Sequence, residues 1–362
     1  MYAARLAIAL RERTGAQIFG MGGQRMAEAG VEILVDYHQV AVVGIAEVLH
    51  KIPTVIGVQE RLAREAAWRK AALAILVDSP GTHLGVARRL KRAGIPVGYF
   101  IGPQIWAWRP GRVRTVKRLV QRMVVIFPFE EEIYREAGVP VNFVGHPLVD
   151  VVRPTRSRED FAAQHGLDLA RPIVALLPGS RRSEIARNFP AILDGCARLA
   201  RRAAAGREIQ FLHAAAPNLT GEFWSASERP ELHIKRIEGA TYDLLNAADC
   251  AVVASGTATV EAALIGTPMV IVYRVARVTA AVLRWMLHTP VIGMVNLIAR
   301  TRVAPELVQD DFTPERVERE VSRLLESPEA REAMKADLAK VRAKLGPGGA
   351  IERAADIFAA ML

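Results

Sequence analysis

The chain has 362 residues, of which 51% are hydrophobic and 24% are charged, and its formal net charge at pH 7 is +10. This composition is typical of a folded globular protein and excludes an intrinsically disordered chain. Lysine and arginine are spread along the sequence, which argues against a nucleic-acid-binding arm, whereas an anionic membrane surface or a phosphorylated substrate would suit the charge. One core rarely serves so many residues, so we expect domains over 1–150 and 151–345, and a last helix in 346–362 that is free to pack back on the first domain.

Cysteine usage and hydropathy point to a cytoplasmic protein. Cys196 and Cys250 both lie in apolar segments, which indicates reduced thiols in a core. No signal peptide is visible at the start of the sequence. The nearest approach to a membrane span, residues 278–297, is interrupted by Arg284 and Pro290, so we expect no transmembrane helix.

The first residues predict a helix over 3–13 and then a short strand over 17–20. An α/β domain usually begins with a strand that lies in the middle of its sheet. We therefore expect either a fold that tolerates this start or a chain that lacks the usual first strand.

Residues 40–49 are apolar and are followed by several lysines and arginines. A core helix is the favoured interpretation, and the alternative is an apolar patch, rimmed by cations, that rests on a membrane or receives acyl chains.

Two polar residues of the first half follow predicted strands. Asp78 comes after a buried strand over 71–77. Ligands of open α/β sheets bind beyond the carboxyl ends of the strands, so Asp78 lies where a general base belongs, although it could equally be the N-cap of a helix over 83–93. His146 follows a strand over 141–144. It could be a catalytic acid, but a hydrogen bond to the backbone is the favoured interpretation.

A loop rich in tryptophan follows the predicted strand over 96–101. Trp106 and Trp108 are flanked there by Gln104 and Arg109. Exposed tryptophans are unfavourable, so we expect this loop to pack over something.

The second half contains a strand, a glycine turn and a helix in succession. Residues 171–177 are apolar, Gly179 and Ser180 break the strand, and a helical pattern begins at Arg181. The free N–H groups and the dipole at a helix N-terminus favour an anion, and the guanidinium of Arg181 suits phosphate oxygens. The alternative is an ordinary turn with solvated arginines.

A similar turn follows the predicted strand over 250–254. Ser255 and Thr257 could cap free N–H groups of the next helix. Glu261 lies one turn into that helix and could accept hydrogen bonds from a ribose diol, or it could simply be a carboxylate favoured by the helix dipole. A further strand over 269–273 follows.

Several chemistries lack their motif in this sequence. No Gly-x-Gly-x-x-Gly follows a strand and no Walker-type loop is present, which counts against a dinucleotide enzyme or a phosphate-loop NTPase. No Cys/His cluster has metal-ligand spacing, and no Asp-x-Asp is available to hold a divalent ion. We therefore expect an enzyme that needs no metal and no cofactor.

Six motifs follow one another along nearly the whole chain: Gly20-Met21-Gly22-Gly23-Gln24-Arg25-Met26, Val43-Gly44-Ile45-Ala46-Glu47-Val48-Leu49, Gln104-Ile105-Trp106-Ala107-Trp108-Arg109, Phe143-Val144-Gly145-His146-Pro147, Leu177-Pro178-Gly179-Ser180-Arg181 and Ala254-Ser255-Gly256-Thr257-Ala258-Thr259-Val260-Glu261. This ordered set closely resembles the lipid-A-disaccharide synthase family of GT-B glycosyltransferases, which have two Rossmann-like domains facing across a cleft. The resemblance implies an acceptor- and lipid-binding first domain and a UDP-sugar-binding second domain.

The family resemblance also implies a reaction and a place in the cell. The substrates would be UDP-2,3-diacylglucosamine and 2,3-diacylglucosamine 1-phosphate, and the products UDP and a β-1,6 disaccharide, made at the cytoplasmic face of the inner membrane of Gram-negative bacteria by a peripheral enzyme. Asp78 would be the base and Arg181 would stabilise the leaving UDP. The implied substrate-binding residues are Gly179, Ser180, Ser255, Gly256, Thr257, Glu261, Tyr273, Arg274, Asn296, Gln104, Trp108, Arg109 and His146. A homodimer is a further candidate assembly.

Two features depart from the family pattern. The family begins with a strand that ends in a Gly-Glu-x-Ser-Gly-Asp turn, and this chain starts at the helix that follows it. Gly81-Thr82-His83 stands where the family usually has Asp-Phe-Asn, next to Asp78 on the acceptor side. The alternatives left open are another GT-B enzyme that uses a UDP-sugar, such as an N-acetylglucosaminyltransferase or an epimerase, and a non-catalytic membrane-binding remnant. The Trp106–Trp108 loop argues against the former, and the joint presence of Asp78, Arg181 and Glu261 argues against the latter.

Overall fold

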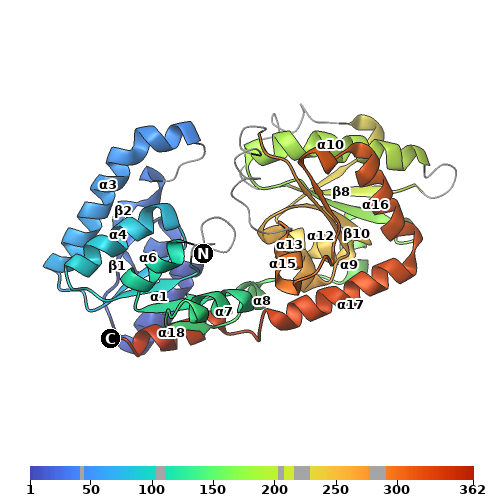
Figure 1. Cartoon of the computed structure of the whole chain (residues 1–362). Coiled ribbons are helices and arrows are strands. Elements are labelled where there is room, and N and C mark those ends of the chain that lie inside the picture. The colour runs from blue at the N-terminus through green and yellow to red at the C-terminus, as the bar shows by residue number, and fades with distance from the viewer. Residues whose placement is uncertain (41–44, 103–110, 203–207, 216–228, 277–279, 281–290) are drawn as a thin grey trace. The chain divides into compact units, whose positions relative to one another are not determined.

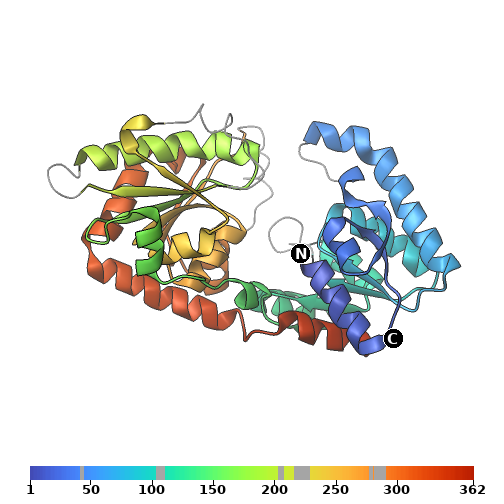
Figure 2. The same ribbon diagram turned by 180° about the vertical axis from the view of Figure 1, so that it is seen from behind.

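A computed structural model of the chain describes residues 1–40, 45–102, 111–202, 208–215, 229–276, 280 and 291–362 (Figure 1). The chain divides into two compact units, the first made of Met1–Pro147 and Leu345–Leu362 and the second of Leu148–Lys344. Both are α/β units, and every strand pair in them is parallel (Figures 1 and 2). Among the described helices, none is both long and apolar enough to cross a membrane.

The first unit contains a four-stranded sheet and a separate parallel pair of strands. The sheet has the order β3-β4-β5-β6, and β1 pairs with β2. The strands of the first unit are β1 (Phe19–Gly22), β2 (Glu32–Asp36), β3 (Ala74–Val77), β4 (Val97–Phe100), β5 (Arg122–Val125) and β6 (Val141–Phe143). Its helices are α1 (Tyr2–Thr14), α2 (Gln24–Glu28), η1 (Tyr37–Gln39), α3 (Ile45–Trp68), α4 (Pro80–Arg92), α6 (Arg112–Leu119), α7 (Pro128–Glu136) and α18 (Ala350–Ala359).

The last helix of the chain, α18, packs in the first unit. It lies along α1, where Arg13 forms ion pairs of 2.6 Å with both Glu352 and Asp356. Phe358 is fully buried and lies over Gly98 of β4, where a Cβ atom would come within 2.5 Å of its ring. Glycine at this position of the strand therefore makes room for the aromatic side chain of α18.

The second unit is built on one six-stranded parallel sheet of order β12-β11-β10-β7-β8-β9. Its strands are β7 (Ile173–Leu177), β8 (Gln210–Ala215), β9 (Lys235–Glu238), β10 (Cys250–Ala254), β11 (Met269–Tyr273) and β12 (Glu306–Val308). Its helices are α8 (Leu148–Val151), α9 (Arg158–His165), α10 (Arg182–Arg202), η2 (Pro230–Leu232), α12 (Thr241–Ala247), α13 (Thr257–Ile265), α15 (Met294–Ala299), η3 (Gln309–Asp311), α16 (Pro314–Glu326) and α17 (Pro328–Lys344). Helices α10 and α16 cover one face of the sheet, and α12 and α13 lie on the other (Figures 1 and 2).

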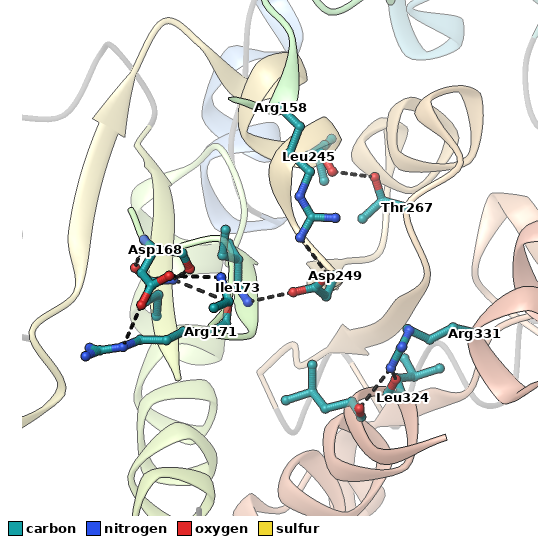
Figure 3. A network of polar contacts seen from close by, with 12 residues as sticks. Arg158, Asp168, Arg171, Ile173, Leu245, Asp249, Thr267, Leu324 and Arg331 are labelled. Carbon is teal, nitrogen blue, oxygen red and sulfur yellow. Dashed lines mark hydrogen bonds and ion pairs between the residues drawn. The ribbon is translucent and has the colours of Figure 1, made fainter. Parts of the chain in front are cut away.

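Read in chain order, the second sheet has the doubly wound order 3-2-1-4-5-6, and the order reverses between β7 and β10. All five residues of each of these two strands are buried, as expected for parallel strands covered on both faces. Asp249 fixes their register at the amino end, where its carboxylate accepts hydrogen bonds of 2.8 Å from the Ile173 N–H and from Arg158 (Figure 3). The carboxyl ends of β7 and β10 are thereby held side by side.

The helix favoured for residues 40–49 is present from Ile45 onward, but α3 is longer than that pattern indicates, because its 24 residues continue through Pro53 to Trp68. The short strand β12 pairs with the edge of β11. Three helices, α16, α17 and α18, follow β12.

Candidate active site

Two turns lie together where the strand order of the second sheet reverses. Leu177, the last residue of β7, is the register partner of Val253 in β10. Gly179 and Ser255 therefore begin their turns at the same edge of the sheet, one strand apart. In doubly wound sheets this is the position at which ligands bind, because the two following helices diverge to opposite faces and leave a crevice.

The Gly179 turn already holds a negatively charged group. The carboxylate of Glu184 accepts hydrogen bonds from the backbone N–H groups of Ser180, at 3.2 Å, and Arg181, at 3.3 Å, and its other oxygen lies 2.9 Å from the Arg181 guanidinium. Gly179 has φ +130°, and a Cβ there would lie 2.8 Å from the Cβ of Glu184. Glycine thus allows the side chain of the first helical turn to fold back over the turn, and the groups around it are suited to an anion.

The turn after β10 leaves the start of α13 without a side-chain cap. Gly256 is the N-cap residue, with φ +149° and no side-chain hydrogen bond. The expected capping by Ser255 and Thr257 is therefore wrong, because the Ser255 hydroxyl donates instead to the Ile292 carbonyl at 3.1 Å. Since Gly256 and Thr257 are both exposed, the N–H groups of this helix end face solvent, where they could bind oxygen atoms of a ligand.

Tyr273 lies close to the Gly179 turn, although it comes from β11. Its pKa is raised by burial and by the negative charge of Glu184, while the positive charge of Arg181 opposes the shift. Arg187 of α10 also acts on the phenol, and the other two charges, Glu184 and Arg181, belong to the Gly179 turn. Tyr273 and Arg181, which were predicted separately from the sequence, are therefore brought together here.

Glu261 lies in α13 and is partly covered. Its carboxylate accepts a hydrogen bond of 3.4 Å from the hydroxyl of Tyr242, a residue of α12. Burial raises the pKa of Glu261, and the bond from Tyr242 partly offsets this. A partly desolvated carboxylate of this kind gains from additional hydroxyl donors, as a ribose diol would supply.

Arg274 is tied to the first turn by a buried amide. Asn188 of α10 is fully buried, its amide nitrogen donates to the Pro178 carbonyl at 3.0 Å, and its oxygen accepts from the Arg274 N–H at 3.0 Å. The Arg274 side chain donates to the Phe312 carbonyl and lies over the Phe312 ring at 4.8 Å. Asn188 thus connects the ends of β7 and β11, and the sequence reasoning did not find it.

Asn296 has a structural role and not the expected contact with the donor. It is fully buried in α15. Its amide nitrogen donates to the Ala304 carbonyl at 2.8 Å and to Glu306 at 2.7 Å, and its oxygen accepts from the N–H groups of Val303 and Ala304. All four hydrogen-bonding positions of the amide are used within the protein, so none is left for a substrate.

Asp78 follows β3 in the first unit, and its carboxylate is not used for capping. The N-cap of α4 is Ser79, so the alternative that Asp78 caps this helix is wrong. Asp78 is exposed and has φ +55°. Its carbonyl oxygen accepts hydrogen bonds from the hydroxyl of Tyr99 at 2.8 Å and from Nδ1 of His83 at 2.7 Å. The backbone of the residue is therefore fixed while its carboxylate faces solvent.

His146 is a packing residue of the first unit. It is 3% exposed, its ring lies 5.1 Å from that of Phe127, and its backbone N–H donates to the Leu345 carbonyl at 2.8 Å. Burial lowers its pKa to about 4, so the ring is neutral at pH 7. The ring is buried in the first unit, and the main-chain N–H, rather than the side chain, makes this hydrogen bond to the backbone. Gln104, Trp106, Trp108 and Arg109 lie outside the described residues, as does 41–44 of the predicted apolar patch.

Glu184 and Tyr242 also belong to the site and were missed. Glu184 had a readable signal, because an acidic residue at the third position of a helix commonly folds back on the N-terminus. Tyr242 had none, since its contact depends on how α12 packs beside α13. In the part of the chain that the structure describes, no group of three or more His, Cys, Asp or Glu side chains could hold a metal ion.

The sequence is similar to one family over almost its whole length. The sequence profile described as "Lipid-A-disaccharide synthetase" matches residues 1–359. The lipid-A-disaccharide synthase of Geobacter sulfurreducens is 44% identical over 355 residues, which are 98% of this chain and 92% of that protein. The enzyme of the same name from Myxococcus xanthus is 45% identical over 361 residues, again 98% and 92% of the two chains.

Solved structures share the fold at low identity. The structure titled "S. aureus MnaA-UDP co-structure" has a TM-score of 0.64 at 12% identity and covers 100% of this chain and 95% of its own. The UDP-GlcNAc 2-epimerase from Neisseria meningitidis bound to UDP-GlcNAc has a TM-score of 0.63 at 13% identity, covering 98% and 96%. MurG of Acinetobacter baumannii has a TM-score of 0.59 at 13% identity, covering 98% and 95%. At such identities the likeness concerns the fold alone.

Proposed function

The chain belongs to the lipid-A-disaccharide synthase family and is a glycosyltransferase, and from this premise we propose that it transfers 2,3-diacylglucosamine from UDP-2,3-diacylglucosamine to the 6-hydroxyl of 2,3-diacylglucosamine 1-phosphate. The resemblance found in the motifs is confirmed, and so is the α/β fold of GT-B type. Neither another UDP-sugar enzyme nor a non-catalytic remnant is favoured. The single observation that carries the donor side is the pair of turns at the strand-order reversal of the second sheet.

The second unit would bind UDP at these turns. Arg181 and the N–H groups of the Gly179 turn surround a carboxylate in the free protein, and a diphosphate offers the same kind of oxygen acceptors with more charge. The uncapped N-terminus of α13 adds further donors. Glu261 would accept hydrogen bonds from the ribose. As the bond to the sugar breaks, the β-phosphate gains negative charge, and Arg181 would stabilise it.

The first unit would supply the base. The 6-hydroxyl of the acceptor must lose a proton as it attacks the anomeric carbon, whose transition state is expected to resemble an oxocarbenium ion. Asp78 is suited to this because it ends a strand, is exposed and is fixed through its backbone by Tyr99 and His83. A base that is positioned through its main chain keeps its carboxylate available for the substrate.

A surface of α3 would place the enzyme on the membrane. Ile52, Ile56 and Trp68 are large apolar side chains of α3 that are 44%, 42% and 77% exposed. Arg61 and Arg64 are exposed on the same helix. Apolar side chains beside cations are suited to an anionic interface, so we propose peripheral binding at the cytoplasmic face of the inner membrane.

The test is acceptor-dependent release of UDP from UDP-2,3-diacylglucosamine. We expect release only when 2,3-diacylglucosamine 1-phosphate is present. Asp78→Asn should keep UDP binding and lower kcat by at least about 100-fold, because it removes a proton acceptor at nearly constant shape. Glu12→Gln is the matched control, since Glu12 is an exposed carboxylate of α1 in the same unit.

Two outcomes would contradict the proposal. Release of UDP that does not depend on the acceptor would point to hydrolysis or epimerisation of the donor. Normal turnover by Asp78→Asn would remove Asp78 from the proton transfer while leaving the donor side intact.

A further inference from the structure

A basic pocket lies between α3, α4 and α6 of the first unit. Its volume is about 440 Å³, and Arg88, Arg89 and Arg112 line it together with Gln59, Thr115 and Ile56. None of its lining residues is a carboxylate. The volume falls within the range of small-molecule sites, and three guanidinium groups without a lining acid favour an anion.

Buried hydrogen bonds fix the positions of side chains that line the pocket. Gln59 is 7% exposed; its amide nitrogen donates to the Thr82 carbonyl at 3.1 Å, and its oxygen accepts from Arg89 at 2.7 Å. Arg89 also donates to the Gly85 carbonyl at 3.2 Å. At Gly85 a Cβ would lie 2.3 Å from the Gln59 amide, so only glycine lets α3 and α4 approach closely enough for this contact.

The charge of the pocket is incompletely neutralised. Arg89 has one distant carboxylate partner, Glu60, at 3.5 Å. Arg88 is exposed, and its guanidinium has no hydrogen-bond or ion-pair partner among the described residues. The pocket therefore presents a guanidinium that is available to a ligand, beside a second one whose position is fixed by a buried amide.

The pocket lies next to Asp78. Gly81, three residues after Asp78 in the chain, is one of its lining residues. The charge of Arg112 acts on Tyr99, whose hydroxyl donates to the Asp78 carbonyl. An anion in the pocket would thus lie close to the proposed base.

One side of the pocket is apolar and continues outward along α3. Ile56 lines the pocket, and Ile52, one helical turn earlier, is exposed. A ligand that fits this surface carries an anionic group and an apolar portion on the same molecule.

From this arrangement we propose that the basic pocket binds the phosphate group of the lipid acceptor and holds the acceptor sugar against Asp78. The proposal rests on the proposed function, because the 6-hydroxyl and the 1-phosphate of that acceptor belong to one sugar ring, so the phosphate must lie within a sugar's length of the base. Arg88 binds the phosphate oxygens directly, and Arg89 and Arg112 supply charge around them. A headgroup of a neighbouring anionic phospholipid offers the same chemistry and is the other source to be distinguished.

The experiment compares acceptors with and without the 1-phosphate in neutral detergent micelles. For the wild-type protein we expect a KM for 2,3-diacylglucosamine 1-phosphate at least about ten-fold below that for 2,3-diacylglucosamine, since a charge-assisted hydrogen bond is lost without the phosphate. Arg88→Gln should raise the KM for the phosphorylated acceptor by about ten-fold and leave the KM for the other acceptor unchanged. Arg88→Lys should recover part of the loss, because it restores the charge.

Arg114→Gln is the matched control, because Arg114 is exposed on α6 and does not line the pocket. A second arm measures binding of the same variants to phosphatidylglycerol vesicles. An Arg88→Gln variant that loses vesicle binding but keeps the wild-type preference between the acceptors would overturn the proposal and assign the pocket to a membrane lipid. Equal KM values of the wild-type protein for the two acceptors would also overturn it. Wild-type protein that turns over neither acceptor would instead refute the proposed function, and a preference for the phosphorylated acceptor in direct micelle binding would still be measurable.

Discussion

In the proposed donor site, Glu184 lies at the N–H groups that would bind the diphosphate. Its carboxylate accepts from the N–H groups of Ser180 and Arg181 and pairs with the Arg181 guanidinium at 2.9 Å. A bound diphosphate would have to displace this carboxylate or lie directly beside it. Glu184→Gln keeps the shape of the side chain but removes the charge, so we expect UDP to bind more tightly to this variant.

The size of the gain follows from the geometry. Two unit charges about 4 Å apart repel by about 1 kcal/mol in water and by about 4 kcal/mol near a protein surface. Glu184 is partly covered, but the Arg181 side chain beside it is 68% exposed, so solvent reaches the turn and we use the lower figure. A change of about 1 kcal/mol corresponds to roughly five-fold in Kd. The same substitution removes a carboxylate from the first turn of α10 and should lower the free energy of unfolding by about 0.5 kcal/mol.

The assay is calorimetric titration with UDP at low salt, repeated at 0.5 M salt, where the gain should shrink. Arg181→Ala is the opposing variant and should weaken UDP binding. Glu159→Gln is the matched control, because Glu159 lies in the first turn of α9, away from both turns. Unchanged or weaker UDP binding by Glu184→Gln would refute the reasoning, since it would mean that the diphosphate does not use these N–H groups.

Two further predictions concern stability. The buried Asp243 accepts four hydrogen bonds from Thr155 and Arg156, which outweigh the effect of burial and lower its pKa. Asp243→Asn should therefore cost about 2 kcal/mol in urea unfolding at pH 7. The difference should begin to shrink only below about pH 4, where the carboxyl of the unfolded chain takes up a proton, and should vanish below the lowered pKa of the folded protein. Burial lowers the pKa of His146 to about 4, so the unfolded chain binds a proton first as the pH falls. The free energy of unfolding should drop by about 3 kcal/mol between pH 6.5 and 4, and His146→Asn should reduce this pH dependence. An unchanged pH dependence in that variant would mean that other groups, such as His213, cause it.

The strands of the second unit could be predicted well from the sequence. β10 and β11 have the expected bounds, because buried parallel strands are continuous apolar runs that end sharply at small residues or prolines. By contrast, β12 has three residues and forms a strand only because the edge of β11 is available to it. The length of α3 was not predicted because Pro53 lies inside the helix, and a proline normally indicates a helix end.

The parts of the site that depend on backbone conformation could be predicted from the sequence. The parts that depend on which side chains contact each other could not. A glycine turn after a strand can be recognised from sequence, and Gly179 and Gly256 both have the positive φ that such turns require. An asparagine in a loop looks the same whether it binds a ligand or the protein. Asn296 was expected to lie near the donor, yet its amide donates two hydrogen bonds to, and accepts two from, residues 303–306. These partners depend on how the chain returns after α15.

The conformation of the turn after β3 explains why Asp78 keeps its carboxylate free. An aspartate before a helix usually uses its side chain to cap the first N–H groups. Here Asp78 and Ser79 have φ +55° and +48°, a conformation that is unfavourable by roughly 1 kcal/mol or more for each residue. This places Ser79 at the N-cap position and moves Asp78 outside the helix. Tyr99 and His83 stabilise this conformation by donating hydrogen bonds to the Asp78 carbonyl. None of the described residues donates a hydrogen bond to the Asp78 carboxylate, which therefore stays available to a substrate.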